Sequence, residues 1–394
     1  MGLDLAKDER RMFDGEFGQA AAESMEILVA LGKIYGAKRM VKIGSAQVSG
    51  VSFKTIGEAG LGYLEDLAKK GAKVTVPTFL NPAGMDRKQW KEMKIPEDFA
   101  KKQLMVLDAY SKMGIMETCT CTPYLIGLRP KLGEHVAWAE SSAVAFCNSV
   151  LGARTNREGG PSALAAAICG VTPEYGLHLD ESRVSGLIVD VKCELKTIAD
   201  FSALGSFVGK MAKTNYPAFM GIKKESASEE KLKVLGASMA ATGSVPLFFM
   251  KGVTPEWNVD DKAQKITATQ NEINNEKKSL DSKMKPDLVT IGCPHASINE
   301  IEEVAELVAK RKPTCEFWVC TARKTKEKAD GLGYTRIIEA AGGRVVADTC
   351  MVVCPLEKMG YVTTGTNSGK AAAYLPNLCK QKVAFGDLED ILYR

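Results

Sequence analysis

Apolar and polar positions alternate along most of the chain in the patterns of short strands and amphipathic helices. Residues 9–36 repeat apolar side chains every three or four positions, which predicts a helix. Two strand-like runs, 40–43 and 74–79, flank a helical segment at 55–70, which predicts a strand–helix–strand unit. The chain therefore begins with an α/β pattern.

The middle of the chain has a weaker pattern. Its polar segments keep a helical period and its strand-like runs are short, so a boundary between lobes is expected near residue 200. Expected helices cover residues 97–113, 137–150, 223–240 and 258–284, and expected strands cover residues 187–191 and 247–250.

The last hundred residues have the clearest pattern. Strands at 287–292, 317–322 and 344–347 alternate with helices at 297–311 and 329–341. Such alternation predicts a parallel βαβαβ unit, so the fold class is α/β.

Three units follow from these patterns. Residues 1–200 are predicted to form one or more N-terminal α/β lobes, with a Cys121 loop and an Arg154/Arg157 loop. Residues 201–284 are predicted to be an intermediate helical or mixed segment, and residues 285–394 a C-terminal α/β lobe.

Composition narrows the class of protein. With 394 residues and 45% hydrophobic content, the chain can bury a large core. Its net charge of +4 is spread without a basic block, so nucleic acid is not an expected partner. No apolar run approaches the roughly 20 residues of a membrane span, and the charged start does not resemble a secretory signal. We expect a cytoplasmic protein, and eleven cysteines without an export signal fit a reducing compartment.

Three cysteines occupy positions where ligands gather. Cys293 and Cys350 each follow an expected strand, and Cys121 lies on a polar loop that ends at Pro123. Three thiolates from separate loops can hold an iron–sulfur cluster and leave one iron open as a Lewis acid. Packing as small apolar side chains is the alternative, and spacing alone does not decide between the two. The chain has no Cys-x-x-Cys, which disfavours a zinc ribbon, a ferredoxin or a thioredoxin-type pair.

Two loops have the composition of an anion site. Residues 152–162 contain Arg154, Arg157, two glycines and a helix start at Pro161. Residues 44–52 are rich in small hydrogen-bond donors. A solvated loop is the alternative in each case.

Several segments occurring together carry a resemblance to a known family. They are residues 48–52, 120–124, 138–142, 148–162, 293–295, 348–350 and 366–368. Together they resemble the aconitase X family over essentially the whole chain. The long central segment is the most specific, and the short cysteine segments are specific only in its company.

The resemblance implies an aconitase-like catalytic body of several αβα lobes with parallel sheets, lacking the mobile swivel domain. That domain, with the catalytic serine base, is then expected on a separate small subunit. The resemblance also implies a cluster bound by Cys121, Cys293 and Cys350. A [4Fe-4S] cluster is expected, although two-iron and mononuclear centres also suit three sulfur ligands. Cys119 and Cys354 lie two and four positions from proposed ligands, which leaves the choice of ligands open.

The implied activity is that of a hydro-lyase acting on a small anionic hydroxy acid. Archaeal two-chain members convert (R)-5-phosphomevalonate to trans-anhydromevalonate 5-phosphate in the mevalonate pathway of isoprenoid biosynthesis. Bacterial members dehydrate cis-3-hydroxy-L-proline and carry a fused swivel domain, so we favour phosphomevalonate for this shorter chain and keep hydroxyproline as the alternative.

Substrate contacts are expected from the polar segments. A guanidinium matches a carboxylate or phosphate with two hydrogen bonds, so Arg154 and Arg157 are predicted to bind the anionic ends. Further predicted contacts are Ser49, Ser52, Glu140, Asn156, Asn367, Ser368 and Lys370.

Two other classes of protein stay open at this point. A non-enzymatic iron sensor of aconitase type would need a basic face for nucleic acid, which the dispersed charge does not supply. A zinc hydrolase would normally recruit histidine, and the chain has only three. We expect these histidines to be structural, except His295, which lies two residues from Cys293.

Overall fold

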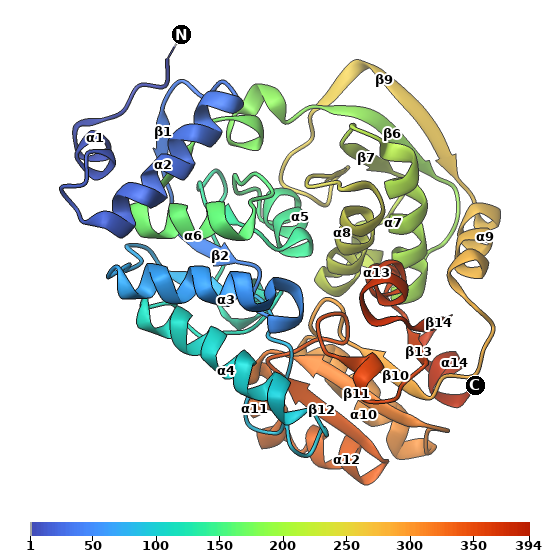
Figure 1. Cartoon of the computed structure of the whole chain (residues 1–394). Helices are drawn as coiled ribbons and strands as arrows, with labels where there is room; N and C mark the ends of the chain where they lie inside the picture. The colour runs from blue at the N-terminus through green and yellow to red at the C-terminus, as the bar shows by residue number, and fades with distance from the viewer. Residues whose placement is uncertain (1) are drawn as a thin grey trace.

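The computed structural model describes residues 2–394 and has the mixed α/β architecture with parallel sheets that the sequence predicts. Three lobes surround a common centre, coloured blue to green, green to yellow, and orange to red in Figure 1. At this centre α8 (Glu229–Gly243) contacts both α5 (Ser141–Ser149) and α13 (Gly369–Cys379), so each lobe contributes a helix.

The first lobe begins with two helices, and the prediction of a single helix over 9–36 is wrong. These helices are α1 (Lys7–Phe13) and α2 (Gln19–Ile34). Between them, Gly15 and Gly18 have φ values of +87° and +95°. Glycine tolerates this left-handed region and a helix cannot continue through it, so the chain turns there.

A three-stranded parallel sheet organises the rest of the first lobe. Its order is β3 (Thr78–Leu80), β2 (Ala46–Val48) and β4 (Ala137–Trp138), and α3 (Phe53–Lys69) connects β2 to β3. The strand–helix–strand unit is therefore present, but its first strand lies inside the segment expected to be a loop.

The run predicted as that first strand belongs elsewhere. It forms β1 (Met40–Lys42), which pairs antiparallel with β5 (Val171–Pro173) in a separate two-stranded sheet. Two helices complete the lobe: α4 (Glu97–Lys112) and α6 (Gly160–Cys169).

The middle lobe holds a parallel sheet of order β8-β7-β6-β9. Its first strand in the chain, β6, lies before the boundary predicted near residue 200. The elements are β6 (Ser185–Val191), α7 (Ile198–Ala212), β7 (Pro217–Met220), α8, β8 (Phe249–Met250), β9 (Val259–Ala268) and α9 (Gln270–Leu280).

The prediction of a helix over 258–284 is correct only for α9. Strand β9 forms the sheet edge and pairs with β6 alone, and most of its side chains are exposed. An edge strand of this kind buries few residues, so its polar sequence does not show a clear period of two.

The third lobe confirms the predicted parallel unit. Its sheet has the order β12-β11-β10-β13-β14, and every neighbouring pair is parallel. The strands are β10 (Leu288–Ile291), β11 (Glu316–Thr321), β12 (Gly343–Ala347), β13 (Thr363–Thr366) and β14 (Lys382–Phe385).

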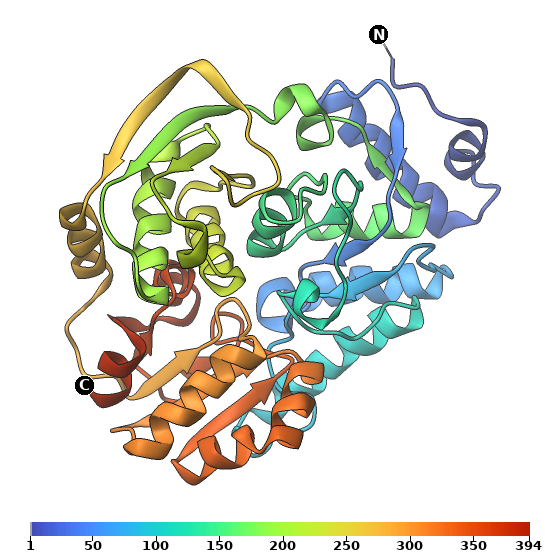
Figure 2. The ribbon, with the colours of Figure 1, turned by 180° about the vertical axis from the view of Figure 1, so that it is seen from behind.

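Helices cover this sheet on the face shown in Figure 2, where α10 (Ile298–Lys310) runs across it in light orange. The helix predicted over 329–341 is divided at Gly333, which has a φ of +82°. The resulting helices are α11 (Arg323–Leu332) and α12 (Tyr334–Ala340), and a short α14 (Leu388–Tyr393) ends the chain. Across residues 2–394, none of the helices has the length and apolar character needed to cross a membrane.

Candidate active site

The carboxyl ends of parallel strands from the first and third lobes meet, and predicted site residues gather there. Glu140 follows β4 in the first lobe, whereas Cys293 follows β10 and Cys350 follows β12 in the third. Backbone pairing of Ala83 with Thr349 joins the two lobes at this edge. Ligands of open parallel sheets collect at the carboxyl ends of strands, so this junction is the candidate site.

The three thiols predicted as metal ligands lie together in this junction. Cys121, Cys293 and Cys350 are all buried. Each is near enough to another of the three for the charge of one thiolate to raise the pKa of its neighbour. The backbone N–H of His295 donates to Sγ of Cys121 at 3.2 Å, so the loop after β10 touches the loop that carries Cys121.

The electrostatic surroundings of the three thiols are alike. Burial raises the pKa of each to about 12. The ammonium of Lys370 opposes this rise at all three, and a hydrogen bond from Ser368 opposes it at Cys293. A thiol binds a metal ion as the thiolate, so these thiols would release their protons when a metal centre binds.

Cys119 and Cys354 lie in different surroundings. Burial raises the pKa of Cys119, and the nearby charge of Asp348 raises it further. Burial also raises the pKa of Cys354, whose strongest charged neighbour is Cys379. Lys370 is not among the groups that act most strongly on either thiol. These differences separate the two thiols from the three at the junction.

A buried ion pair between the first and third lobes borders the thiols. Lys370 of α13 pairs with Glu140, the residue before α5. Burial opposes both charges, but the partner's charge together with the neighbouring thiols or hydrogen-bond donors outweighs it, so the pKa of Lys370 is raised and that of Glu140 is lowered. Glu140 also accepts hydrogen bonds from Oγ of Ser142 at 2.5 Å and from N of Ala143 at 2.7 Å. The site therefore contains a fixed cation and a carboxylate held in its charged form.

The spacing of the thiols bears on the metal centre that they could hold. Within the described chain, no three His, Cys, Asp or Glu side chains converge as closely as the ligands of a single metal ion. Sulfur ligands of one zinc ion each lie about 2.3 Å from the metal and therefore touch one another. Three buried thiols from separate loops beside a fixed cation are a donor set of the kind that iron–sulfur clusters use, so the residues present fit that group.

Arg154, predicted to bind a substrate anion, already has two carboxylate partners. Its guanidinium donates to Asp180 at 2.9 Å and to Glu256 at 2.7 Å. The backbone of Arg154 pairs with that of His135, which precedes β4, whereas Glu140 follows β4 at its opposite end. Both carboxylates would have to be displaced before Arg154 could bind an anion, and the structure does not place it with the thiols.

The neighbouring residues Asn156 and Arg157 differ in their surroundings. The amide of Asn156 donates to the carbonyl of Tyr175 at 3.0 Å and accepts from N of Leu177 at 2.9 Å, so it holds the local backbone. Arg157 is exposed, and the ion pairs formed within residues 2–394 do not include it. Its guanidinium is therefore the one on this loop that is available to an anion.

The two loops predicted to meet ligand lie against each other. A Cβ at Gly160 would come within 2.7 Å of the carbonyl oxygen of Ser49, so this close approach requires glycine. Ser52 has a structural contact instead. Its Oγ caps α3 by accepting from N of Lys54 at 3.3 Å, and it donates to the carbonyl of Val353 at 3.0 Å.

Ser368 and Asn367 follow β13 beside the thiols. Oγ of Ser368 caps α13 by accepting from N of Ala371 at 3.1 Å, and the same hydroxyl is near enough to Cys293 to lower the pKa of that thiol. Asn367 is buried and lines a hollow between the middle and third lobes. Ser368 therefore lies beside a thiol, and Asn367 precedes it on the same loop.

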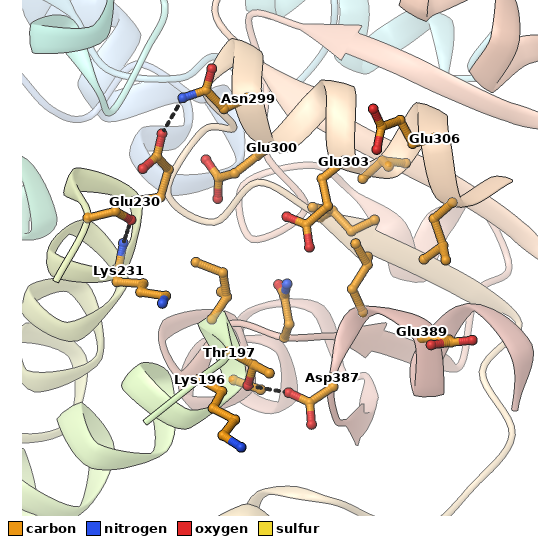
Figure 3. Close-up of a pocket in the computed structure, with 18 of the residues that line it drawn as sticks. Lys196, Thr197, Glu230, Lys231, Asn299, Glu300, Glu303, Glu306, Asp387 and Glu389 are labelled. Atoms are coloured by element: carbon orange, nitrogen blue, oxygen red, sulfur yellow. Dashed lines mark hydrogen bonds between the residues drawn. The ribbon is translucent and has the colours of Figure 1, made fainter. Parts of the chain in front are cut away.

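That hollow has a volume of about 540 Å³, and its carboxylates outnumber its lysines, Lys196, Lys231 and Lys310 (Figure 3). Burial raises the pKa of Glu303, and the charges of Glu300 and Glu230 raise it further. An anionic substrate would be repelled there, so we do not assign this hollow to the substrate. Its acidic residues are Glu230, Glu300, Glu303, Glu306, Asp387 and Glu389.

A charged network that sequence reasoning did not single out lies next to Cys350. Asp348 and Asp86 are completely buried, and Arg323 donates to both. Arg87 also donates to Asp348, at 3.0 Å. These residues come from separate segments of the first and third lobes and form no local motif, so no sequence signal marks them.

Comparisons with known families and proteins follow the same three lobes. Models described as the first, second and third domains of aconitase X match residues 2–181, 185–283 and 286–394. A protein of Methanothermobacter thermautotrophicus, named phosphomevalonate dehydratase large subunit, is 53% identical over 98% of both chains. This chain belongs to the aconitase X family.

Other relatives agree with the reaction class. The phosphomevalonate dehydratase large subunit of Methanocaldococcus jannaschii is 50% identical, over 98% of this chain and 99% of the relative. A cis-3-hydroxy-L-proline dehydratase of Pseudomonas aeruginosa is 33% identical, over 96% of this chain and 68% of the relative. Each name denotes the loss of water, and this aconitase X chain is a carbon–oxygen hydro-lyase.

A solved structure has the same architecture. The holo-form of aconitase X from Thermococcus kodakaraensis matches with a TM-score of 0.93 at 47% identity, over 99% of both chains. The predicted aconitase-like body of α/β lobes with parallel sheets is thereby confirmed.

Proposed function

We propose that this aconitase X chain is the large subunit of an enzyme that converts (R)-5-phosphomevalonate to trans-anhydromevalonate 5-phosphate in the archaeal mevalonate pathway. The observation that carries the proposal is full-length similarity to phosphomevalonate dehydratase large subunits, at 53% and 50% identity. The relatives named for cis-3-hydroxy-L-proline are 33% and 32% identical, and the match covers 68% of each of them. Hydroxyproline is therefore the less favoured substrate.

The cofactor is assigned to Cys121, Cys293 and Cys350, which would hold an iron–sulfur cluster, expected as [4Fe-4S]. When bound, such a cluster supplies an open iron that acts as a Lewis acid toward the departing hydroxyl group. Three buried thiols beside the Lys370 cation support this assignment. In the described chain none of the eleven cysteines forms a disulfide, which suits a reducing cytoplasm.

The substrate's charged groups are assigned to the cations of the first and third lobes. Lys370 lies beside the thiols, where an ammonium would stabilise the enolate-like charge that develops when the proton next to the carboxylate is lost. Arg157 can bind a phosphate or carboxylate with two hydrogen bonds. Ser49 and the first N–H groups of α6 lie next to this arginine's loop and suit the same anion.

The other predicted contacts are given different roles. Asn367 and Ser368 are proposed to border the substrate, because they follow β13 next to Cys293. Arg154, Asn156 and Ser52 are proposed to support the fold, since their polar groups already have protein partners.

The proton acceptor is proposed to lie on a separate small subunit that carries the swivel domain. Glu140 is a poor base, because Lys370 and its hydrogen-bond donors hold its pKa below the ordinary value despite its burial. The name "large subunit" of the relatives also fits a two-chain enzyme.

An anaerobic assay tests the proposed function. The chain is reconstituted with iron and sulfide, combined with its small subunit, and offered mevalonate 5-phosphate and cis-3-hydroxy-L-proline in parallel. Turnover of the phosphorylated substrate is expected. Turnover of hydroxyproline alone would contradict the proposed substrate, as would inactivity toward both by a chain with a full cluster.

A further inference from the structure

Every polar group of His295 has a hydrogen-bond partner, although the residue is completely buried between the lobes. Its backbone N–H donates to Sγ of Cys121 at 3.2 Å, and its carbonyl accepts from Nζ of Lys233 at 3.0 Å. Its ring bonds Oγ1 of Thr120 through Nδ1 at 3.0 Å and the carbonyl of Thr349 through Nε2 at 2.8 Å.

These contacts connect the three loops that carry the thiols. Thr120 is adjacent to Cys121, and Thr349 is adjacent to Cys350. His295 itself lies two residues after Cys293. One imidazole therefore joins three loops that are far apart in the chain, and Lys233 adds a contact from the middle lobe.

The partners determine which ring nitrogen carries the proton. The carbonyl of Thr349 can only accept a hydrogen bond, so Nε2 must donate. Oγ1 of Thr120 can donate as well as accept, so Nδ1 needs no proton of its own to bond it. The hydroxyl of Thr120 then donates to Nδ1. A ring protonated at Nε2 alone satisfies both bonds.

We infer that His295 is a positioning residue that sets the separation of Cys121, Cys293 and Cys350 and so determines how firmly an iron–sulfur cluster is held. The inference rests on the proposed cofactor. Groups that orient metal ligands affect metal affinity by roughly 10- to 100-fold although they do not touch the metal. A hydrogen bond to a ligand sulfur also changes the properties of a cluster, and the His295 N–H makes such a bond to Cys121.

Substitutions that remove the ring contacts separately test the inference. His295→Leu removes both ring contacts, whereas His295→Gln can keep a donor toward Thr349 and His295→Asn can keep an acceptor toward Thr120. Thr120→Val removes one donor with little change in volume. The full-length chains are reconstituted anaerobically with iron and sulfide, and iron loss to a chelator is followed by visible absorbance.

Iron loss is expected to be about tenfold faster in His295→Leu, with smaller effects in the two amide variants and in Thr120→Val. The matched control is His178→Leu, because His178 is also buried but belongs to the cluster around His135. This control is expected to lower the thermal midpoint and leave iron loss unchanged. Wild-type rates in both folded His295→Leu and Thr120→Val would overturn the inference.

A second readout separates this inference from the proposed cofactor. Alkylation of the cluster-free chain by iodoacetamide, followed peptide by peptide, reports on the thiols without iron. Thr120→Val is expected to speed alkylation of Cys121 several-fold and leave the buried Cys147 unchanged. If wild type takes up no iron, the cofactor assignment fails, but this readout still decides whether His295 positions the loops. Equal alkylation in wild type and Thr120→Val would overturn the positioning role.

Discussion

The ammonium of Lys370 acts on all three thiols of the junction and pairs with Glu140. It counters the cost of placing negative charge in a buried site. The ion pair with Glu140 fixes this cation near the thiols. It therefore stabilises thiolates without having to move.

Lys370→Met is expected to leave Glu140 buried without its partner. We expect the free energy of unfolding to fall by about 3–5 kcal/mol, because an uncompensated buried charge is costly. Denaturant unfolding measures the change, and the double variant Lys370→Met/Glu140→Gln is the control, since it removes both charges. The double variant should recover most of the stability but bind less iron than wild type. Equal stability of single and double variants would contradict this account of the pair.

His178 gives a prediction about pH. Burial, and after it the charge of His135, lowers its pKa from 6.5 to about 3, so the folded state holds the ring neutral. As pH falls from 6.5 toward 3, the unfolded chain takes up a proton that the folded chain refuses, and the free energy of unfolding decreases. The contribution approaches about 1.4 kcal/mol per pH unit. Urea unfolding between pH 7 and pH 5 should therefore show a shallower decline in His178→Gln than in wild type, and parallel declines would show the prediction to be wrong.

At the scale of elements, the ends of β10, β12 and β13 present Cys293, Cys350 and Ser368 at one edge of the third sheet. Gly292 makes the turn between β10 and Cys293 with a φ of +94°. A Cβ there would collide with the carbonyl oxygen of Cys320 on the neighbouring strand β11. The direction in which Cys293 leaves the sheet therefore depends on this glycine.

Gly292→Ala is expected to destabilise the fold by about 1–3 kcal/mol and to reduce iron content, because it strains the backbone next to Cys293. The control is Gly331→Ala in α11, where a Cβ meets no neighbouring atom. That substitution should be neutral or stabilise by up to about 1 kcal/mol. Thermal unfolding and iron analysis measure the two effects. Wild-type stability and iron content in Gly292→Ala would show that this turn does not determine the position of Cys293.

At the scale of the whole molecule, the first and third lobes meet through buried charges. The Asp86–Arg323–Asp348 contacts, the Lys370–Glu140 pair and the His295 ring all cross this boundary. The site is therefore assembled by lobe packing, and a substitution remote from sulfur can affect it.

Arg323→Met removes a cation shared by two buried carboxylates, Asp86 and Asp348. We expect a loss of about 3–5 kcal/mol and faster hydrogen exchange around the pairing of Ala83 with Thr349. Arg336→Met, an exposed arginine on α12, should change stability by less than about 0.5 kcal/mol. Similar exchange in the two variants would show that the network does not hold the lobes together.

The sequence predicted those features that depend on nearby residues. The strands and helices of the third lobe follow from local apolar periods, and Cys293 and Cys350 were found because they follow such strands. The partners of Arg154 could not be predicted, because Asp180 and Glu256 lie 26 and 102 residues away. The pattern of residues 258–284 predicts a helix where β9 forms, because the strand lies at the sheet edge and buries few side chains.

The iron and sulfide content of five single Cys→Ser chains, each reconstituted anaerobically, tests the assignment of the cluster ligands. Replacement of Cys121, Cys293 or Cys350 is expected to abolish the cluster and its visible absorbance. Replacement of Cys119 or Cys354, which lie close in sequence but outside the group around Lys370, is expected to leave both near wild-type values. A full cluster in any of the first three chains, or its loss in either of the last two, would contradict the assignment of the ligands.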